Sequence, residues 1–326
     1  MVKREIELVD RYGHEGKKSF LYFLFLFLVV ALMVSMFLLY ELFPRGTETF
    51  VQYELTKNFS SFGSAGDGQF YPNMRFPDSV ISYDVDVGCS GSRKADTLDA
   101  FNRLSEETIL EFYNSPGNPQ IVIHCSDKAR VEGKMIIAGE GGPNYVVQTD
   151  LYNVIYNGSI LLLKDSPCGN SNIALHELLH VFGFGHSNVT SSIMYPTSNC
   201  EQQLSQDIII TLNKLYSVES LPDLYFTQAS ANTSGRYLNF NFEIKNQGLK
   251  DSDGFNVSVS ANDKFLESFF MDGIGVGEGR TLRVSNLKMP KAEMNNLSFV
   301  IDGENKIKEI NKGNNKIILN TMPEGN

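Results

Sequence analysis

One segment of eleven residues, His176 to His186, constrains this chain more than any other part of its sequence. It reads HELLHVFGFGH. His176 and His180 are four residues apart, so on an α-helix they lie on one face, one turn above each other. Gly183 permits a sharp turn, because glycine adopts positive φ without a Cβ clash, and the turn returns His186 to the same point. The segment therefore predicts a helix, a turn and three histidines around one centre.

Three histidines at this spacing predict a catalytic zinc site. Three protein ligands leave one tetrahedral position of the ion open, which distinguishes catalytic from structural zinc. Glu177 lies about 100° round the helix from the first ligand. It is close enough to act as a general base on a water at the open position. The chain has only five histidines, and the other two, His14 and His124, belong to no metal constellation.

The whole segment fits H-E-x-x-H-x-x-G-x-x-H and resembles the signature of the metzincin metallopeptidases. Residues 192–196, SIMYP, are similar to the Met-turn of these enzymes, with Met194 beneath the ligands. Ser187 and the Met-Tyr-Pro order are most similar to the matrixin branch. The resemblance implies an α+β catalytic domain with a mixed twisted sheet, an active-site helix and a closing C-terminal helix at residues 205–216. It also implies a zinc endopeptidase with Glu177 as general base.

In metzincins an edge strand above the zinc pairs with the substrate backbone. The resemblance suggests this role for Ile136, Ile137, Ala138 and Gly139, because such pairing favours extended peptides. The glycine-rich residues 139–143 that follow suggest a turn. An ordinary strand followed by a glycine turn explains the same residues equally well.

Periodicity predicts the other elements of this domain. Apolar residues at helical spacing, Leu98 and Phe112 among them, predict an amphipathic helix over residues 93–113. The active-site helix should run from Asn172 to Val181. Short β-rich runs predict strands at residues 80–85, 120–124 and 159–163.

Four cysteines lie in the predicted catalytic region, an even number that favours disulfides in an exported protein. Three pairings are open to four cysteines. We favour Cys89–Cys125 and Cys168–Cys200, of which the second encloses the zinc motif. No CxxC spacing is present, which speaks against a cysteine-type zinc site.

Residues 20–40 form an uncharged apolar run of 21 residues. As a helix this run would be about 31 Å long, which matches the hydrocarbon core of a bilayer. A cleaved signal peptide would have an apolar region of about 7 to 15 residues and a small-residue cleavage site. Neither fits, so we expect an uncleaved signal anchor. Basic residues are more frequent before the run than after it, which places residues 1–19 in the cytoplasm and the rest outside.

Residues 41–75 are polar and contain a Gly/Ser stretch, so they predict a tether between the membrane and a catalytic domain at residues 76–220. From residue 221 to 321 the pattern changes to alternating strands, as in an all-β immunoglobulin-like sandwich. Leu221–Leu224, Lys245–Gly248 and Asn314-Asn315 resemble CARDB modules of prokaryotic surface proteins. That resemblance implies a spacer or a module that binds a surface ligand. Few contacts are expected across the junction at Leu221.

These features predict a single-pass cell-membrane protein whose extracellular zinc endopeptidase domain acts on peptides or proteins. A surface adhesion or scaffold protein with an inactive zinc domain is a second interpretation. A zinc amidase that acts on cell-wall peptides is a third, because zinc and a glutamate suit any amide. The net charge of −10 speaks against nucleic acid as a partner, since nucleic acid requires basic patches.

Overall fold

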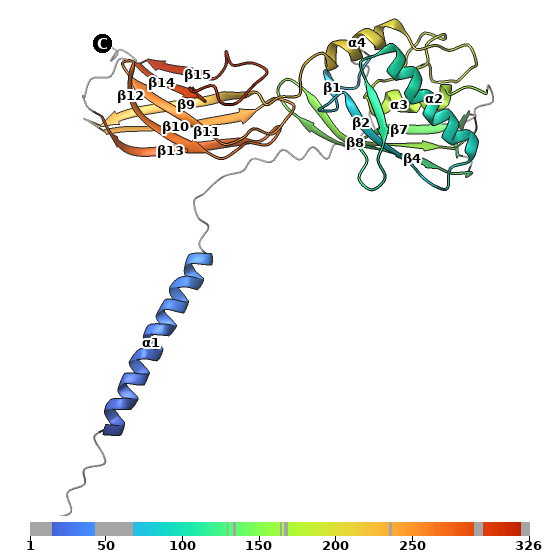
Figure 1. The fold of residues 1–326 in the computed structure, drawn as a ribbon. Coiled ribbons are helices and arrows are strands. Elements are labelled where there is room, and N and C mark those ends of the chain that lie inside the picture. Colours follow the sequence, from blue (N-terminus) through green and yellow to red (C-terminus); the bar gives the residue numbers. More distant parts are fainter. Residues whose placement is uncertain are drawn as a thin grey trace, which may run out of the picture. The chain divides into compact units, whose positions relative to one another are not determined.

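The computed structural model divides the chain into two compact units, Met1–Glu48 and Thr49–Asn326 (Figure 1). It describes residues 15–42, 68–128, 130–132, 135–163, 165, 169–234, 237–289 and 296–320.

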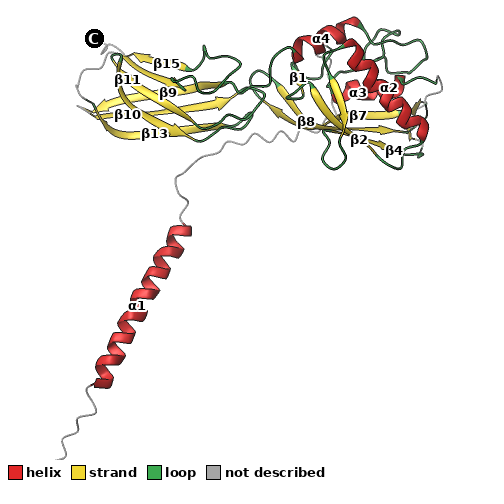
Figure 2. Cartoon of the chain, in the orientation of Figure 1, coloured by secondary structure: helices red, strands yellow, loops and turns green. Residues whose placement is uncertain are grey.

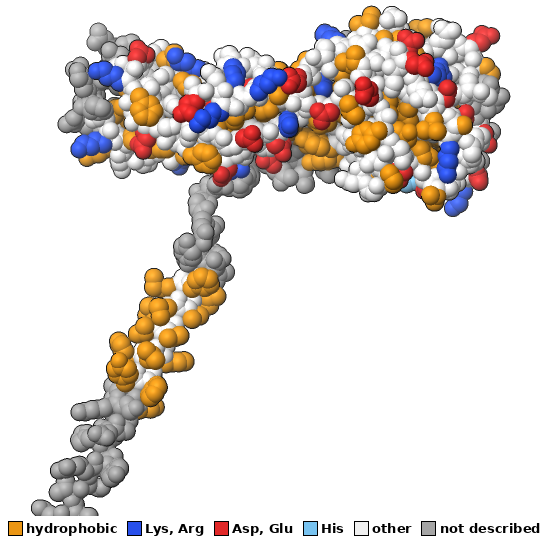
Figure 3. All heavy atoms as spheres, viewed as in Figure 1, with side chains coloured by type: hydrophobic (Ala, Val, Ile, Leu, Met, Phe, Trp, Pro, Cys, Tyr) orange, Lys and Arg blue, Asp and Glu red, His pale blue; other side chains and the backbone are white. Residues whose placement is uncertain are grey.

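The first unit contains helix α1, Glu15–Leu42. Its large hydrophobic side chains between Phe20 and Leu38 are exposed, and Figure 3 shows them in orange around the helix. Among the residues that the structure describes, no helix meets the length and apolarity of a membrane span. The membrane anchor at residues 20–40 therefore stays a prediction from the sequence.

The second unit begins with a mixed sheet in the strand order β1-β8-β4-β2-β3, with β7 on the other edge of β8. Strands β1, β2, β3 and β4 are parallel to their neighbours, whereas β7 is antiparallel to β8. The bounds are Met74–Arg75 for β1, Val80–Val85 for β2, Glu111–Asn114 for β3, Ile121–Cys125 for β4, Gly139–Gln148 for β7 and Asn153–Leu162 for β8. The strands expected at residues 80–85, 120–124 and 159–163 are β2, β4 and the end of β8.

Three helices pack with this sheet: α2 (Gly91–Glu107), α3 (Asn172–Val181) and α4 (Gln206–Tyr216) (Figure 2). Helix α3 has the bounds expected from the sequence, and α4 is the expected closing helix. The expected helix over residues 93–113 is wrong at its end. Thr108 ends α2, because its φ of −132° and ψ of 173° are extended, while its amide and hydroxyl still donate to the Leu104 carbonyl. Phe112 consequently lies on β3, while Leu98 is 46% exposed and faces away from the core.

Residues 68–75, expected to be tether, instead belong to the domain that contains the mixed sheet. Met74, Arg75 and Phe76 are at most 1% exposed. The Arg75 guanidinium lies 4.5 Å from the centroid of the Tyr216 ring. It donates to the carbonyls of Phe76, Pro77, Leu215 and Val218. Burial lowers the pKa of Arg75, but these four backbone carbonyls accept from its guanidinium.

Residues 224–320 form the expected β-sandwich. One sheet has the order β13-β10-β9 and the other the order β12-β11-β14-β15. Alternate residues of β10 are buried, as the sequence pattern predicts. Phe240, Phe242 and Phe299 pack together in the core. The bounds are Leu224–Ser234 for β9, Tyr237–Asn246 for β10, Phe255–Ala261 for β11, Lys264–Met271 for β12, Gly279–Lys288 for β13, Asn296–Ile301 for β14 and Lys316–Asn320 for β15.

Replacing Arg75 with leucine should destabilise the catalytic domain strongly. The variant leaves at least two buried carbonyls without a donor, at about 1–3 kcal/mol for each. We expect the free energy of unfolding to fall by about 3 kcal/mol or more in urea unfolding of the full chain. Arg283→Leu, at an exposed position of β13, is the control and should change it by less than about 0.5 kcal/mol. Equal effects of the two variants would contradict this role of Arg75.

Candidate metal centre and active site

Contacts from two other segments hold the start of helix α3. Arg103 on α2 donates to the side-chain oxygens of Ser171 and Asn172 at 2.9 and 3.0 Å. The Ser171 hydroxyl donates to Asp99, also on α2, at 2.6 Å. The Asn172 side-chain amide, through Nδ2, donates to the Asn199 carbonyl at 3.0 Å, beyond the Met-turn. These contacts fix the first turn of helix α3, which precedes its first ligand, His176, in the sequence.

The other end of α3 is a Schellman motif. Gly183 has φ +84°. Its amide donates to the His180 carbonyl at 2.9 Å, and the Phe184 amide donates to the Leu179 carbonyl at 3.0 Å. Both bonds satisfy carbonyls that have no partner within the helix. This is the turn that the sequence predicted at Gly183, and it reverses the chain towards His186.

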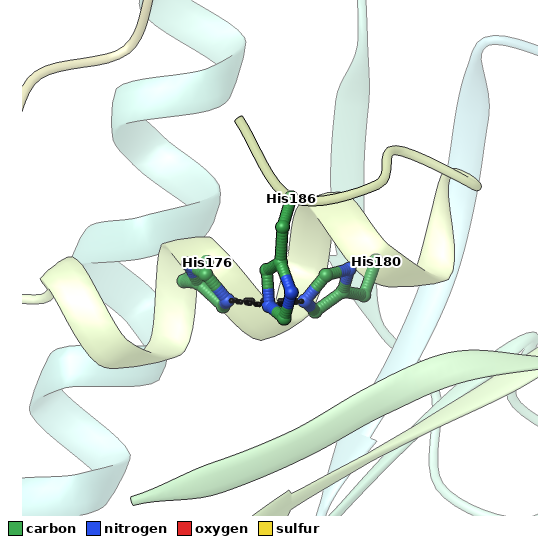
Figure 4. Close-up of side chains that lie close together, drawn as sticks. All are labelled: His176, His180 and His186. Carbon is green, nitrogen blue, oxygen red and sulfur yellow. Dashed lines mark hydrogen bonds between the residues drawn. The ribbon is translucent and has the colours of Figure 1, made fainter. Parts of the chain in front are cut away.

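The turn brings the three histidines together, as Figure 4 shows. The Nε2 atoms of His176 and His180 are 3.0 Å apart. The Nε2 atom of His186 lies 3.3 Å from that of His176 and 3.2 Å from that of His180. Nitrogen ligands of a tetrahedral zinc ion at about 2.0–2.1 Å would be about 3.3–3.4 Å apart. The donor set and its spacing therefore fit zinc.

Backbone carbonyls orient two of these imidazoles. The Nδ1 atoms of His176 and His180 lie 2.7 Å from the carbonyl oxygens of Ile193 and Phe184. Each Nδ1–H donates there, which leaves the Nε2 lone pair directed at the shared centre. Burial lowers the pKa of His176 to about 4 and that of His180 to about 3, and it also lowers the pKa of His186. The three histidines are therefore neutral at neutral pH, as metal ligands must be.

The expected Met-turn follows His186. Met194 is 1% exposed, and its carbonyl accepts from the Ser187 amide at 2.8 Å. The neighbouring residue Ile193 supplies the carbonyl that orients His176. Its amide donates to the Gln203 carbonyl at 2.8 Å. The turn thus fixes the loop that carries the third histidine, while the role of Met194 as a floor for the ion stays a prediction.

Glu177 is buried between α3 and strand β7. It is 6% exposed. A Cβ built on Gly139 would lie 2.7 Å from the Glu177 Cγ atom, and one on Gly141 would overlap the Glu177 carbonyl. Only glycine at these places lets the strand lie so close to the helix. Burial, helped by the nearby charge of Glu140, raises the pKa of Glu177, and a hydrogen bond from the Gly141 amide opposes both effects, so that the pKa is about 8.

The edge strand beside Glu177 is β7 (Gly139–Gln148), whereas the sequence suggested residues 136–139. Of the residues suggested for substrate pairing, only Gly139 lies on it. Ile136 and Ile137 lie on β6 (Met135–Ile137), which pairs with β5 (Arg130–Glu132). Ala138 links β6 to β7, and its carbonyl accepts from the Leu163 amide. The glycine-rich residues 139–143 are strand rather than turn, and the missing side chains of Gly139 and Gly141 make room for Glu177. Glycines two residues apart were the available signal, since such positions share one face of a strand.

A second contribution that the sequence did not reveal comes from residues 68–70. The Phe70 amide donates to the Gly183 carbonyl, and the Gly185 amide donates to the Gly68 carbonyl, each at 2.6 Å. The Gln69 side chain is buried and donates to the Phe182 carbonyl at 2.9 Å. The Phe70 ring stacks on His180, with centroids 6.0 Å apart. We call residues 68–70 the clamp, because they hold the turn that presents His186.

One of the two expected disulfides is confirmed. Cys89 and Cys125 are bonded, and they join the segment before α2 to the end of β4. Cys200 is also disulfide-bonded. Cys168 lies outside the described residues, so the pairing Cys168–Cys200 stays a prediction.

Two protein-family models match the sequence of the chain. Residues 81–217 match the model described as Matrixin, and residues 221–318 match the model described as CARDB. The chain carries a matrixin domain followed by a CARDB domain. Both resemblances seen in the sequence are confirmed, and the cofactor implied by the matrixin domain and its histidines is zinc. No curated protein matches the chain.

Solved structures are similar to each domain. The CARDB domain of a Pyrococcus furiosus protein in complex with di-metal ions is 20% identical. That match covers 30% of this chain and 84% of that chain, with a TM-score of 0.27. High choriolytic enzyme 1, a hatching enzyme zinc-protease from the medaka fish Oryzias latipes, is 16% identical. It covers 48% of this chain and 94% of that chain, with a TM-score of 0.28. The domain assignment rests on the family models.

Replacing His186 with alanine should remove zinc from the matrixin domain. Loss of groups that only orient zinc ligands costs about 10- to 100-fold in affinity, so loss of a ligand should exceed about 100-fold. The measurement is zinc content per chain after dialysis against a weak chelator. His124→Ala is the control, because His124 lies on β4 away from the three ligands, and it should keep its zinc. Full zinc content in the His186→Ala variant would exclude His186 as a ligand.

Proposed function

We propose that this protein is a zinc endopeptidase, anchored in the membrane by residues 20–40, that hydrolyses peptide bonds outside the cell. One observation carries the proposal. The three converging histidines lie beside Glu177, a buried carboxylate that belongs to the same helix and faces an edge strand. A closed structural zinc site needs no such carboxylate, whereas a hydrolase needs a general base there.

Each group has a distinct part in this proposal. His176, His180 and His186 would hold zinc, which when bound would lower the pKa of a water molecule to about 7 and polarise a carbonyl. The Glu177 carboxylate accepts a proton from the attacking water and donates it to the leaving nitrogen. Burial supports this exchange, because it raises the proton affinity of Glu177 towards the working pH. The Gly141 amide keeps the carboxylate in place between the strand and the helix.

The substrate binds along strand β7 in this proposal. Among the described strands, β7 pairs only with β8, so its outer edge is available to an extended peptide. Main-chain hydrogen bonds from such an edge supply affinity without selecting a sequence, and pockets for alternate side chains supply selectivity. An extended segment of a peptide or protein is therefore the expected substrate class.

Replacing Glu177 with glutamine should abolish most hydrolysis but retain zinc, because Glu177 is not a ligand. We expect the rate to fall by about 10² to 10⁴. The measurement is cleavage of a diverse peptide library by the full chain, together with zinc content. Glu106→Gln, at an exposed position of α2, is the matched control and should cleave at the unmodified rate.

Three outcomes separate the candidate functions. Near-normal cleavage by Glu177→Gln would refute Glu177 as general base. A zinc-loaded, unmodified chain that cleaves no peptide in the library would favour a scaffold protein with an inactive zinc domain. Cleavage confined to cell-wall peptides would favour the amidase.

The membrane anchor generates a separate prediction. The uncharged run at residues 20–40 and the exposed apolar side chains of α1 motivate it, and the disulfide at Cys89 suits an oxidising compartment. The full chain should stay in the membrane fraction after alkaline carbonate extraction. A tag placed before residue 1 should be protected from added protease in intact cells, whereas one placed after residue 326 should be digested. A chain that is extracted by carbonate would contradict the anchor, and a reversed protection pattern would contradict the orientation.

A further inference from the structure

The CARDB domain packs against the hairpin formed by β7 and β8. Val154 on β8 forms a buried apolar cluster with Leu249 and Val276 of the CARDB domain. Partly buried side chains complete this cluster: Val147, Tyr152, Tyr156, Val218 and Ile310. The sequence suggested a junction with few contacts across it, and that expectation is wrong. An apolar cluster resists separation, because undocking exposes its surface to water.

Polar and steric contacts fix the turn of the same hairpin. The Thr149 hydroxyl donates to the Gln247 carbonyl at 3.0 Å, and the Tyr225 hydroxyl donates to the Asp150 carboxylate. Gly277 has φ +74°, and a Cβ there would lie 2.6 Å from the Val147 Cγ1 atom. Glycine is therefore required at this position by its backbone and by its neighbour. The CARDB domain follows the shape of the hairpin turn closely.

The other end of this hairpin lies against the active-site helix. Gly141 on β7 contacts the Glu177 backbone, and a Cβ on Gly158 of β8 would lie 2.6 Å from the Val181 Cγ1 atom. Strand β7 continues from Gly141 to Gln148, which is about 24 Å at about 3.4 Å per residue. Its pairing with β8 reaches from Gly139 to Gln148, with register shifts between Pro143 and Val146. One paired ribbon therefore connects the CARDB domain to the general base.

We propose that the CARDB domain is a positioning element of the active site, which acts through the β7–β8 hairpin. Val276, Tyr225 and Gly277 are its positioning residues. They hold the turn of the hairpin and thereby set where β7 lies relative to Glu177 and to the substrate backbone. This inference rests on the proposed peptidase function.

Physical reasoning favours this role over that of a passive spacer. Strand β8 is held in the sheet by β1 and β4, so the edge strand β7 is the part of the hairpin that depends most on the surfaces packed against it. Strand β7 has a strand partner on only one side among the described strands. Misplacement of a catalytic group by about 1 Å can cost about 100-fold in rate. Loss of the support at the turn should therefore reach the far end of the strand.

The test uses the full chain with Val276 replaced by aspartate, which puts a charge into the apolar cluster. Three quantities are measured: hydrogen exchange of the β7 amides, zinc content, and kcat and KM for an extended peptide that the unmodified chain cleaves. We expect faster exchange along β7, unchanged zinc content and a fall of about tenfold in kcat/KM. The fall should include a rise in KM, because substrate pairs with β7. A smaller fraction of folded enzyme would lower kcat and zinc content and leave KM unchanged.

Two further variants are matched to this one. Val276→Ile keeps the site apolar and should restore the unmodified KM. Ile318→Asp introduces the same charge at an exposed position of β15 and should change neither KM nor the exchange of β7. Should Val276→Asp fail to fold, Tyr225→Phe removes one hydroxyl and should give a smaller shift of both quantities in the same direction.

The outcomes distinguish this inference from the proposed function. An unmodified chain without peptidase activity refutes the function and this inference with it. An active unmodified chain, together with Val276→Asp and Tyr225→Phe variants that show unchanged β7 exchange and unchanged KM, overturns the inference and leaves the function intact.

Discussion

The contact between strand β7 and helix α3 is the constraint on which the rest of the structure depends. Backbone meets backbone there, because Gly141 has no side chain to separate the strand from the Glu177 carbonyl. Helix α3 carries two ligands and the carboxylate, so this one contact places the helix that bears them directly against the edge strand. Backbone groups partner most of these polar side chains: carbonyls accept from His176 and His180, and the Gly141 amide donates to the Glu177 carboxylate.

Sequence reasoning recovered what local chemistry determines. Helix α3 follows from apolar periodicity and from the glycine that ends it, and the convergence of the histidines follows from helical geometry. Strand β7 was missed because its glycines indicate a turn when they are considered alone. The reason for glycine at these positions becomes clear only from the close approach of helix α3 to the strand. The helix over residues 93–113 was predicted too long for a similar reason. Its apolar spacing continues past Thr108, but the backbone becomes extended at that residue and the helix ends there.

The domain boundary illustrates a further limit of the sequence. Residues around Leu221 have the composition of a linker, and the strand pattern changes there. Linker-like composition indicates where one domain ends and the next begins, but it does not show whether the two domains pack against each other. The apolar cluster between the domains uses residues far apart in sequence, such as Val154, Leu249 and Val276. Arg75 adds to this continuity, because it binds carbonyls at the end of α4, directly before the CARDB domain begins. The matrixin and CARDB domains are thus joined by packing contacts as well as by the chain itself.

The clamp at residues 68–70 gives the chain upstream of it a mechanical path to the metal centre. Gly68 and Phe70 are joined to the ligand turn by two short backbone hydrogen bonds, at Gly185 and Gly183. Tension applied through the preceding residues would load these two bonds before it reached the sheet, whose first strand begins at Met74. Such a load would act on the turn that presents His186. The position of His186 is therefore coupled to force on the N-terminal side of the chain, through the two hydrogen bonds of the clamp.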